Sequence, residues 1–329
     1  MSRAEHTDTG RASIGTAAPD GTALDGTAPD GTALDGTATI AAPSAAGSHP
    51  WLWTLGLFTS EVSITLRRWR TLALLAVLAA VPVLLGIAVW VETDGGGGSV
   101  ESQGGEGPAF IAQITNNGLF LVFAALAATL PVFLPMAVGV VAGDAIAGEA
   151  SAGTLRYLLV APAGRTRLLL AKYASVLVFC MIATLVVAAS ALAVGALLFP
   201  LGEVTTISGT TISFGEGLLR AVLIAGVVAA SLAGIAAIGL FVSTLVGSGI
   251  AAMATTVGLL ITVQILDTIP QLDALHPYLF PHHWMSFSDL MREPLYWDEV
   301  RQNLELQALY VVVFGSAAWA RFTTKDIDS

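Results

Sequence analysis

Four long stretches of the chain contain no charged residue, and their lengths indicate the class of protein. Three of them, Thr71–Val91, Leu119–Val141 and Tyr173–Leu198, are 21, 23 and 26 residues long. A helix needs roughly 20 residues to cross ~30 Å of bilayer hydrocarbon. The fourth, Ala221–Leu266, has 46 residues, and as one helix it would be about twice that thickness. The pattern predicts membrane-spanning helices and a turn inside the fourth stretch.

That turn is predicted at Ser243–Gly249, where Ser, Thr and Gly favour a break. It divides the stretch into two spans, near Val222–Val242 and Ile250–Leu266. A shorter apolar segment, Leu304–Arg321, carries Glu305 near its start and is predicted as a sixth span. The expected fold class is an all-α integral membrane protein with six transmembrane helices.

The residues before the first span have the period of an amphipathic helix. Between Trp51 and Arg70, the apolar positions recur every three or four residues, as along one face of a helix. These positions are Trp51, Leu55, Phe58, Val62, Leu66 and Trp69. Tryptophans at both ends and arginines near the C-terminus favour an elbow helix lying in the inner membrane interface. A helix that binds a partner protein is the alternative.

The first fifty residues differ from the rest in composition. Asp-Gly-Thr-Ala recurs there at Asp20, Asp25, Asp30 and Asp35. Such residues bury too little apolar area to offset the entropy of ordering, so disorder is expected. The predicted organisation is a disordered cytoplasmic tail over residues 1–50 and a six-span transmembrane domain over 51–329.

The distribution of Lys and Arg predicts the orientation. With the N-terminus inside, eleven of the fourteen lie on the cytoplasmic side, and the opposite orientation would invert this bias. The eleven are Arg3, Arg11, Arg67, Arg68, Arg70, Arg156, Arg165, Arg167, Lys172, Arg321 and Lys325. A multi-pass plasma-membrane protein with both termini in the cytoplasm is therefore expected. The net charge of −10 then falls on the outer segments, which argues against nucleic acid as a partner.

The chain lacks the residues of several enzyme classes. A P-loop needs a lysine after a glycine-rich turn, and neither of the two lysines, Lys172 and Lys325, follows one. The predicted spans also lack the paired aspartates, the Ser/His pair and the His-Glu-x-x-His helix that intramembrane proteases use. The single cysteine, Cys180, is expected to be a small apolar filler. No catalytic residue, cofactor or metal is therefore expected on this chain.

The segment Asp267–Asn303 is predicted to form short helices broken by prolines at the outer surface. It contains the adjacent pair His282-His283, with Met285 and His276 nearby. Adjacent histidines lack the i, i+4 spacing that places two imidazoles on one helical face. We therefore expect a polar interface loop here, and a metal site is the alternative.

The segment Gly143–Lys172 is the one sizeable polar segment on the expected inner side. Thr154 can cap a short helix, Pro162 and Gly164 would end it, and Thr166 can cap the third span. Leu155, Leu158 and Leu159 would share one face of that helix. A helix of this kind can dock in a groove of another protein or lie flat on the lipid, and spacing alone favours neither.

This segment closely resembles the signature loop of ABC-2-type transporter permeases. The resemblance rests on an acidic residue, then Gly-Thr-Leu-Arg, two leucines, Pro, Arg and Lys. The matching residues are Asp144, Glu149, Gly153, Thr154, Leu155, Arg156, Leu158, Leu159, Pro162, Arg165 and Lys172. The elbow helix, the six spans and the helical outer segment before the last span are also similar to that family.

The resemblance implies a permease that works with a second permease subunit, the same or related, and with separate ATPase subunits that bind ATP-Mg. The matched residues would form a coupling helix moved by the ATPases. Within that helix region, Glu149 and Arg156 would position the docking helix, and Arg165 and Lys172 would fix where the third span starts. Spans without deep charge favour a lipid or an amphipathic molecule as substrate. An ion-coupled secondary carrier, and a membrane-embedded enzyme or scaffold, are the alternatives.

Overall fold

The computed structural model describes residues 50–94, 109–153, 164–206 and 208–324, which lie in one compact unit, Ser48–Ser329. In this part of the chain, five helices are long and apolar enough to cross a membrane. They are Trp69–Thr93, Phe133–Ser151, Arg165–Leu198, Phe214–Leu245 and Gly249–Asp267. This is the helical character of a membrane-embedded protein. The tail predicted over residues 1–50 lies outside the described residues, apart from Pro50.

The predicted elbow helix is α1 (Pro50–Arg67), and α2 (Trp69–Asp94) follows after a bend at Arg68. Helix α2 contains the whole first predicted span. Trp69, on the predicted apolar face, is 81% exposed, as a side chain facing lipid would be. Among the side chains of α1 that the structure describes, that of Glu61 is buried.

The second predicted span, Leu119–Val141, is wrong as one straight helix. The chain forms α4 (Phe120–Thr129) and α5 (Phe133–Ser151), with a turn between them. Pro135 has no N–H with which to bond the carbonyl of Pro131 four residues earlier, so the helix is interrupted. The side-chain amide of Gln264 donates to that freed carbonyl instead.

The third and fourth predicted spans are longer in the structure than in the prediction. Helix α7 (Arg165–Leu198) begins eight residues before Tyr173. Helices α8 (Phe214–Ser231) and α9 (Ala233–Leu245) form one apolar rod that is broken at Leu232. The tight turn predicted after it is confirmed, since only three residues separate the end of α9 from the start of α10 (Gly249–Asp267).

Side chains from the last third of the chain bond to polar groups at the break between α8 and α9. The Trp284 indole donates to the Ser231 carbonyl at 2.9 Å, and the Asn303 amide donates to the Ser231 hydroxyl at 2.6 Å. The Gln307 side chain accepts from the Gly234 N–H at 3.2 Å and donates to the Phe280 carbonyl at 2.8 Å. We call Ser231, Trp284, Asn303 and Gln307 the neutral network.

The connections and the last helix complete the described chain. Helix α3 (Ala109–Asn116) precedes α4. Strands β1 (Val204–Thr205) and β2 (Thr211–Ile212) pair antiparallel in one small hairpin, and the other described elements are helical, which is compatible with the predicted all-α class. The 3₁₀ helices η1 (Pro270–Leu272), η2 (His276–Tyr278) and η3 (Trp284–Met291) confirm a segment of short helices before the last predicted span. Helix α11 (Asp298–Thr324) contains the sixth predicted span but is not among the five apolar helices.

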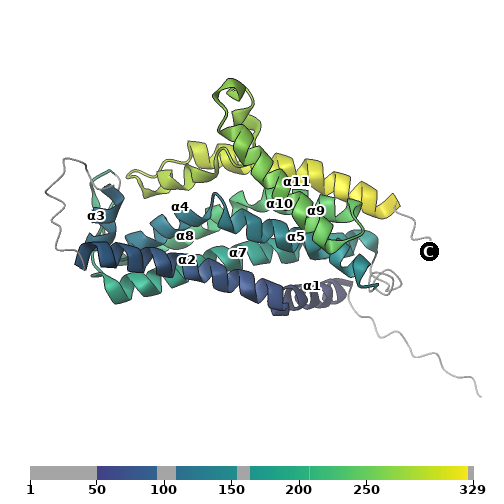
Figure 1. Cartoon of the computed structure of the whole chain (residues 1–329), viewed down its shortest axis with the longest axis horizontal. Helices are drawn as coiled ribbons and strands as arrows, with labels where there is room; N and C mark the ends of the chain where they lie inside the picture. The colour runs from purple at the N-terminus through teal and green to yellow at the C-terminus, as the bar shows by residue number, and fades with distance from the viewer. Residues whose placement is uncertain (1–49, 95–108, 154–163, 207, 325–329) are drawn as a thin grey trace, which may run out of the picture. The chain divides into compact units, whose positions relative to one another are not determined.

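Helix α7 packs against α1, α2, α4 and α8, and α5 lies between α9 and α10 (Figure 1). Small residues bring α5 and α10 together. A Cβ added at Gly143 would lie 3.0 Å from the backbone of Met253, and one at Gly139 would lie 3.3 Å from the Thr256 side chain. This Gly-x-x-x-Gly spacing lets two helix backbones approach closely, as is frequent in membranes.

Burial is uneven among the apolar helices. In the most apolar window of α8–α9, 72% of residues are buried, against 22% in α2 and 22% in α10. Helix α2 exposes Val77, Leu84 and Val91, and α10 exposes Ile250, Ile261 and Ile265. Large apolar side chains in these positions suit contact with lipid or with another apolar helix, which is what a membrane-embedded chain requires.

Candidate functional site

The structure places five of the eleven residues predicted to couple this chain to a partner. Asp144 and Glu149 lie in α5, Gly153 follows α5, and Arg165 and Lys172 lie in α7. The other six lie outside the described residues: Thr154, Leu155, Arg156, Leu158, Leu159 and Pro162. The predicted polar segment Gly143–Lys172 is therefore largely helical at its two ends.

Lys172 is the most deeply buried charged residue among the described residues, with an exposure of 2%. Its ammonium nitrogen lies 2.6 Å from Glu149 Oε1 and 3.1 Å from Glu61 Oε2. Both carboxylates are also buried, at 8% and 5% exposure. A buried charge is tolerated only with charged or hydrogen-bonding partners, so these three residues hold α7, α5 and α1 together.

A second ion pair joins the bend between α1 and α2 to α5. The Arg68 guanidinium lies 2.7 Å from Asp144 Oδ2 and 4.0 Å from Glu149 Oε1. Arg70 approaches the other Asp144 oxygen at 4.0 Å. We call Glu61, Arg68, Asp144, Glu149 and Lys172 the ionic cluster.

Two carboxylates of the ionic cluster, those of Asp144 and Glu149, lie in the C-terminal half of α5. A negative charge near a helix C-terminus is disfavoured by the helix dipole, and the Arg68 and Lys172 cations offset this. Glycines leave the space, because a Cβ at Gly148 or Gly249 would collide with the Asp144 carboxylate. Helix α5 ends at Ser151, and Gly153 follows its C-cap with a φ of +71°, a left-handed conformation that glycine adopts readily.

Arg165 does not join the ionic cluster. It starts α7 and donates to the Thr323 carbonyl at 2.9 Å, close to the C-terminus of α11. The predicted capping role of Thr166 is wrong, because Gly164 occupies the N-cap position and the Thr166 hydroxyl accepts from the Trp319 indole at 3.0 Å. Lys172 lies two turns inside α7, which itself begins at Arg165.

A groove opens beside the ionic cluster. It has a volume of about 650 Å³ and lies between the bend at Arg68, the end of α5 and the start of α10. Its lining includes Trp69, Arg70, Asp144 and Ser151. The groove therefore adjoins the end of α5, and Ala152, which also lines it, is separated only by Gly153 from residues 154–163, which lie outside the described residues.

Sequence reasoning missed Glu61 and Arg68 as members of the site. Glu61 is the one acidic residue between Asp35 and Glu92. Glu61 is not among the positions that form the predicted apolar face of the elbow helix. A lone carboxylate in such a helix is a usable signal, but the partner is distant in sequence, since Lys172 lies 111 residues away.

The histidines of the outer segment lie differently from the prediction as well. Asp267, His276 and His282 come together, whereas His283 is not part of that group. Burial lowers the pKa of the His283 imidazole below its ordinary value, and the neighbouring His282 lowers it further. The sequence pattern pointed to the adjacent pair His282-His283. The contact between His282 and Asp267 was not predicted, because the two residues are 15 positions apart in the sequence.

A family model described as "Protein of unknown function (DUF2705)" matches residues 105–327, which is more than half of the chain. The chain belongs to this family. The match includes α5, α7 and the loop between them, but Glu61 and Arg68 lie before it. No curated protein matches the chain. The DUF2705 description assigns no function, so membership identifies a relationship without an activity.

Proposed function

We propose that this chain is the transmembrane permease subunit of an ATP-driven exporter of the ABC-2 type. ATP would be hydrolysed by separate ATPase subunits, and a second permease subunit, the same or related, would complete the complex. The chain would span the plasma membrane six times, with α11 as the sixth span and both termini in the cytoplasm. The substrate would be a hydrophobic or amphipathic molecule such as a lipid, drug or natural product.

The ionic cluster is the observation that carries this proposal. The segment with the permease-like sequence runs between α5 and α7, and the Lys172–Glu149 pair ties these two helices together at 2.6 Å. Glu61 adds α1 to the same pair at 3.1 Å. A force applied to the segment between α5 and α7 would therefore move three helices as one body.

The mechanism follows from that rigidity. The leucines at 155, 158 and 159 would dock in a groove of the ATPase, and ATP-driven closure would push on this helix. Because α5 and α7 are clamped by buried ion pairs, the push would tilt them rather than bend the loop between them. The tilt would then change how the two permease subunits face each other.

An apolar cavity supports the proposed substrate class. It has a volume of about 420 Å³ and lies between α2, α4 and η3. Phe120, Phe123, Phe287 and Met291 are among its lining residues. Aromatic rings and thioethers offer an acyl chain or a flat apolar molecule large contact areas without a fixed charge.

One observation favours the ion-coupled secondary carrier as a second candidate. Lys172, Glu61 and Glu149 are buried ionisable residues among apolar helices, and such residues often belong to proton or ion pathways. In this chain they pair with one another within hydrogen-bond distance. The carrier would transport in the absence of ATP when an ion gradient is imposed.

The test uses the purified full chain, alone and with its ATPase partner, reconstituted in liposomes. We expect no ATP hydrolysis by the chain alone, and ATP-dependent movement of a fluorescent lipid with the complex. An ATPase whose P-loop lysine is replaced serves as the matched control and should abolish movement. Stoichiometric ATP turnover by this chain alone, or movement driven by an ion gradient without ATP, would overturn the proposal.

A further inference from the structure

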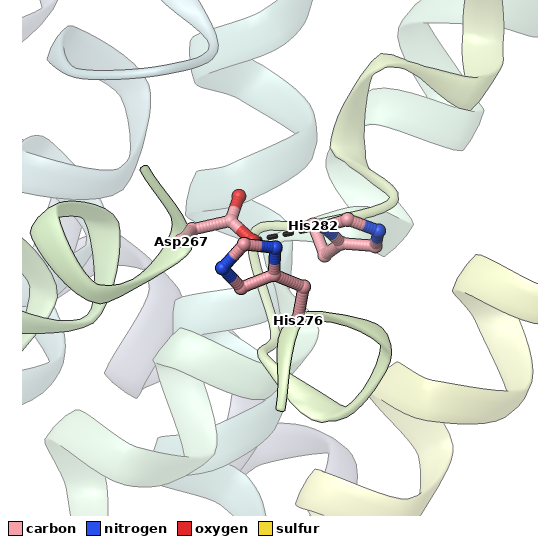
Figure 2. A group of neighbouring side chains, drawn as sticks. All are labelled: Asp267, His276 and His282. Atoms are coloured by element: carbon pink, nitrogen blue, oxygen red, sulfur yellow. Dashed lines mark hydrogen bonds and ion pairs between the residues drawn. The ribbon is translucent and has the colours of Figure 1, made fainter. Parts of the chain in front are cut away.

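Three side chains with metal-binding chemistry converge after α10. Asp267 is the last residue of α10, His276 begins η2, and His282 lies between η2 and η3. One potential ligand atom from each lies within 4.8 Å of the other two. Figure 2 shows both imidazole rings near the Asp267 carboxylate, with a dashed line between His282 and Asp267.

The orientation of each ring leaves a ligand atom for a cation. His282 Nδ1 lies 2.8 Å from Asp267 Oδ1, so these two potential ligand atoms are already adjacent. His276 Nε2 lies 3.1 Å from the Ile269 carbonyl oxygen. A metal-bound histidine usually donates its other ring N–H to a carbonyl or carboxylate. His276 has that second partner in place, which assigns Nδ1 as its ligand atom.

We propose that Asp267, His276 and His282 bind one divalent transition-metal cation, with Zn²⁺ as the ion that best fits the ligand set. Zinc takes imidazole nitrogen and carboxylate oxygen at roughly 2.0–2.2 Å in a tetrahedron. Ligand atoms in such a tetrahedron are roughly 3.3 Å apart. The three atoms lie inside 4.8 Å, so small side-chain rotations bring them to that spacing. Three protein ligands leave a fourth position open to water or to another ligand.

The electrostatic surroundings favour a cation at this place. Asp267 puts a carboxylate at the C-terminus of α10, where the helix dipole is already negative. The segment from Asp267 to Asn303 contains six acidic residues against two basic ones, Arg292 and Arg301. A bound dication would neutralise the Asp267 carboxylate and offset part of this excess.

The site is open to solvent and ties distant parts of the segment together. The His282 side chain is 34% exposed and that of Asp267 is 24% exposed, so an ion has a path to the ligands. His276 is more covered, at 12%. A bound ion would link the end of α10 to the turns that lead to η3. It would thereby stabilise a connection built of 3₁₀ helices, which have poorer hydrogen-bond geometry than α-helices.

The experiment is a Zn²⁺ titration of the full chain, purified without a histidine tag and stripped with a chelator. We expect one ion per chain, and with Co²⁺ as the probe the visible absorption of a tetrahedral nitrogen–oxygen site. His276→Gln and His282→Gln should each weaken Zn²⁺ binding at least about tenfold, as loss of a ligand or of its orientation does. Asp267→Asn should weaken it as well.

Matched controls separate the proposed site from other histidines. His283→Gln changes the residue next to a ligand but removes no ligand. We expect its Zn²⁺ affinity to stay within about threefold of the wild-type value, a smaller change than the roughly tenfold loss expected for a ligand variant. His6→Gln with His49→Gln should also leave the single site in place. Each variant is compared with the wild type by thermal unfolding without metal, which identifies misfolding. Absence of Zn²⁺ binding by the wild type, or equal loss in His283→Gln and His282→Gln, would overturn the proposal.

Discussion

The ionic cluster and the neutral network are two buried polar regions that hold helices together by different means. The ionic cluster joins α1, α2, α5 and α7 through charges, with Lys172 only 2% exposed. The neutral network joins the α8–α9 break to η3 and α11 through amides, an indole and a hydroxyl, and Asn303 is 0% exposed. Both satisfy buried groups, but only the ionic cluster depends on balanced charge.

The two regions constrain their helices differently. Neutral hydrogen bonds to a helix break are directional, so the neutral network favours one backbone geometry. Ion pairs depend less on direction, and Arg68 lies 2.7 Å from Asp144 and 4.0 Å from Glu149. Under the proposed mechanism, the helices of the ionic cluster would shift together while their charges stay paired. The segment with the permease-like sequence lies between two of these helices, α5 and α7.

The largest effect is expected from Lys172→Met. It removes the ammonium group that both buried carboxylates, Glu61 and Glu149, contact, and breaking a buried ion pair by removing one partner costs about 3–5 kcal/mol. We expect a matching loss of stability in denaturant unfolding of the purified protein. The triple variant with Glu61→Gln and Glu149→Gln removes the uncompensated charges and should regain most of the loss. If the triple variant is no more stable than Lys172→Met, the charge balance of the ionic cluster is not what stabilises it.

A smaller loss is expected from Gln307→Leu in the neutral network. This change leaves the Gly234 N–H and the Phe280 carbonyl without their side-chain partner, and unsatisfied buried groups cost about 1–3 kcal/mol each. For the two groups together we expect a loss of stability of about 2–3 kcal/mol in the same unfolding measurement. This is the lower part of the summed range, because the helix can relax around the substitution. Gln302→Leu, an exposed position on the same helix, is the control and should change stability little.

The smallest of the three effects is expected from Gly143→Val, which perturbs the support of the ionic cluster and not its charges. Its Cβ would lie 3.0 Å from the Met253 backbone, and overpacking of this kind costs about 1–3 kcal/mol. The α5–α10 contact should loosen while the ion pairs persist. Gly258→Val is the control on α10, because a Cβ there meets nothing within 4 Å. Equal losses in the two variants would show that the close approach of α5 and α10 is not needed.

The approximate place of the apolar helices could be predicted from the sequence because long charge-free runs mark it. Their ends and breaks could not. The Lys and Arg residues just before Tyr173 were assigned to the polar segment on the expected inner side, yet α7 contains Arg165, Arg167 and Lys172, and Lys172 contacts buried carboxylates. The break between α4 and α5 depends on Pro135 and on Gln264, which lies 133 residues from the carbonyl that it bonds.

The candidate site was only half predictable for the same reason. Asp144, Glu149 and Lys172 lie close together in sequence and were predicted as functional residues. Glu61 lies on α1 and Arg68 lies at the bend between α1 and α2, and Arg68 is 76 residues from Asp144. No local pattern specifies such a pair, because tertiary packing of α1 and α2 against α7 and α5 brings the charges together.

The most direct test of the account is whether the loop between α5 and α7 binds an ATPase. The measurement is the amount of ATPase recovered with the affinity-purified chain when Leu155 and Leu158 are both replaced by Asp. Carboxylates in a dry groove are costly without partners, so we predict that the ATPase is lost while the chain stays inserted in the membrane. The control is Leu201→Asp with Leu295→Asp, two exposed leucines on segments expected outside, which should retain the ATPase. Undiminished ATPase binding by the Leu155→Asp/Leu158→Asp variant would contradict the account.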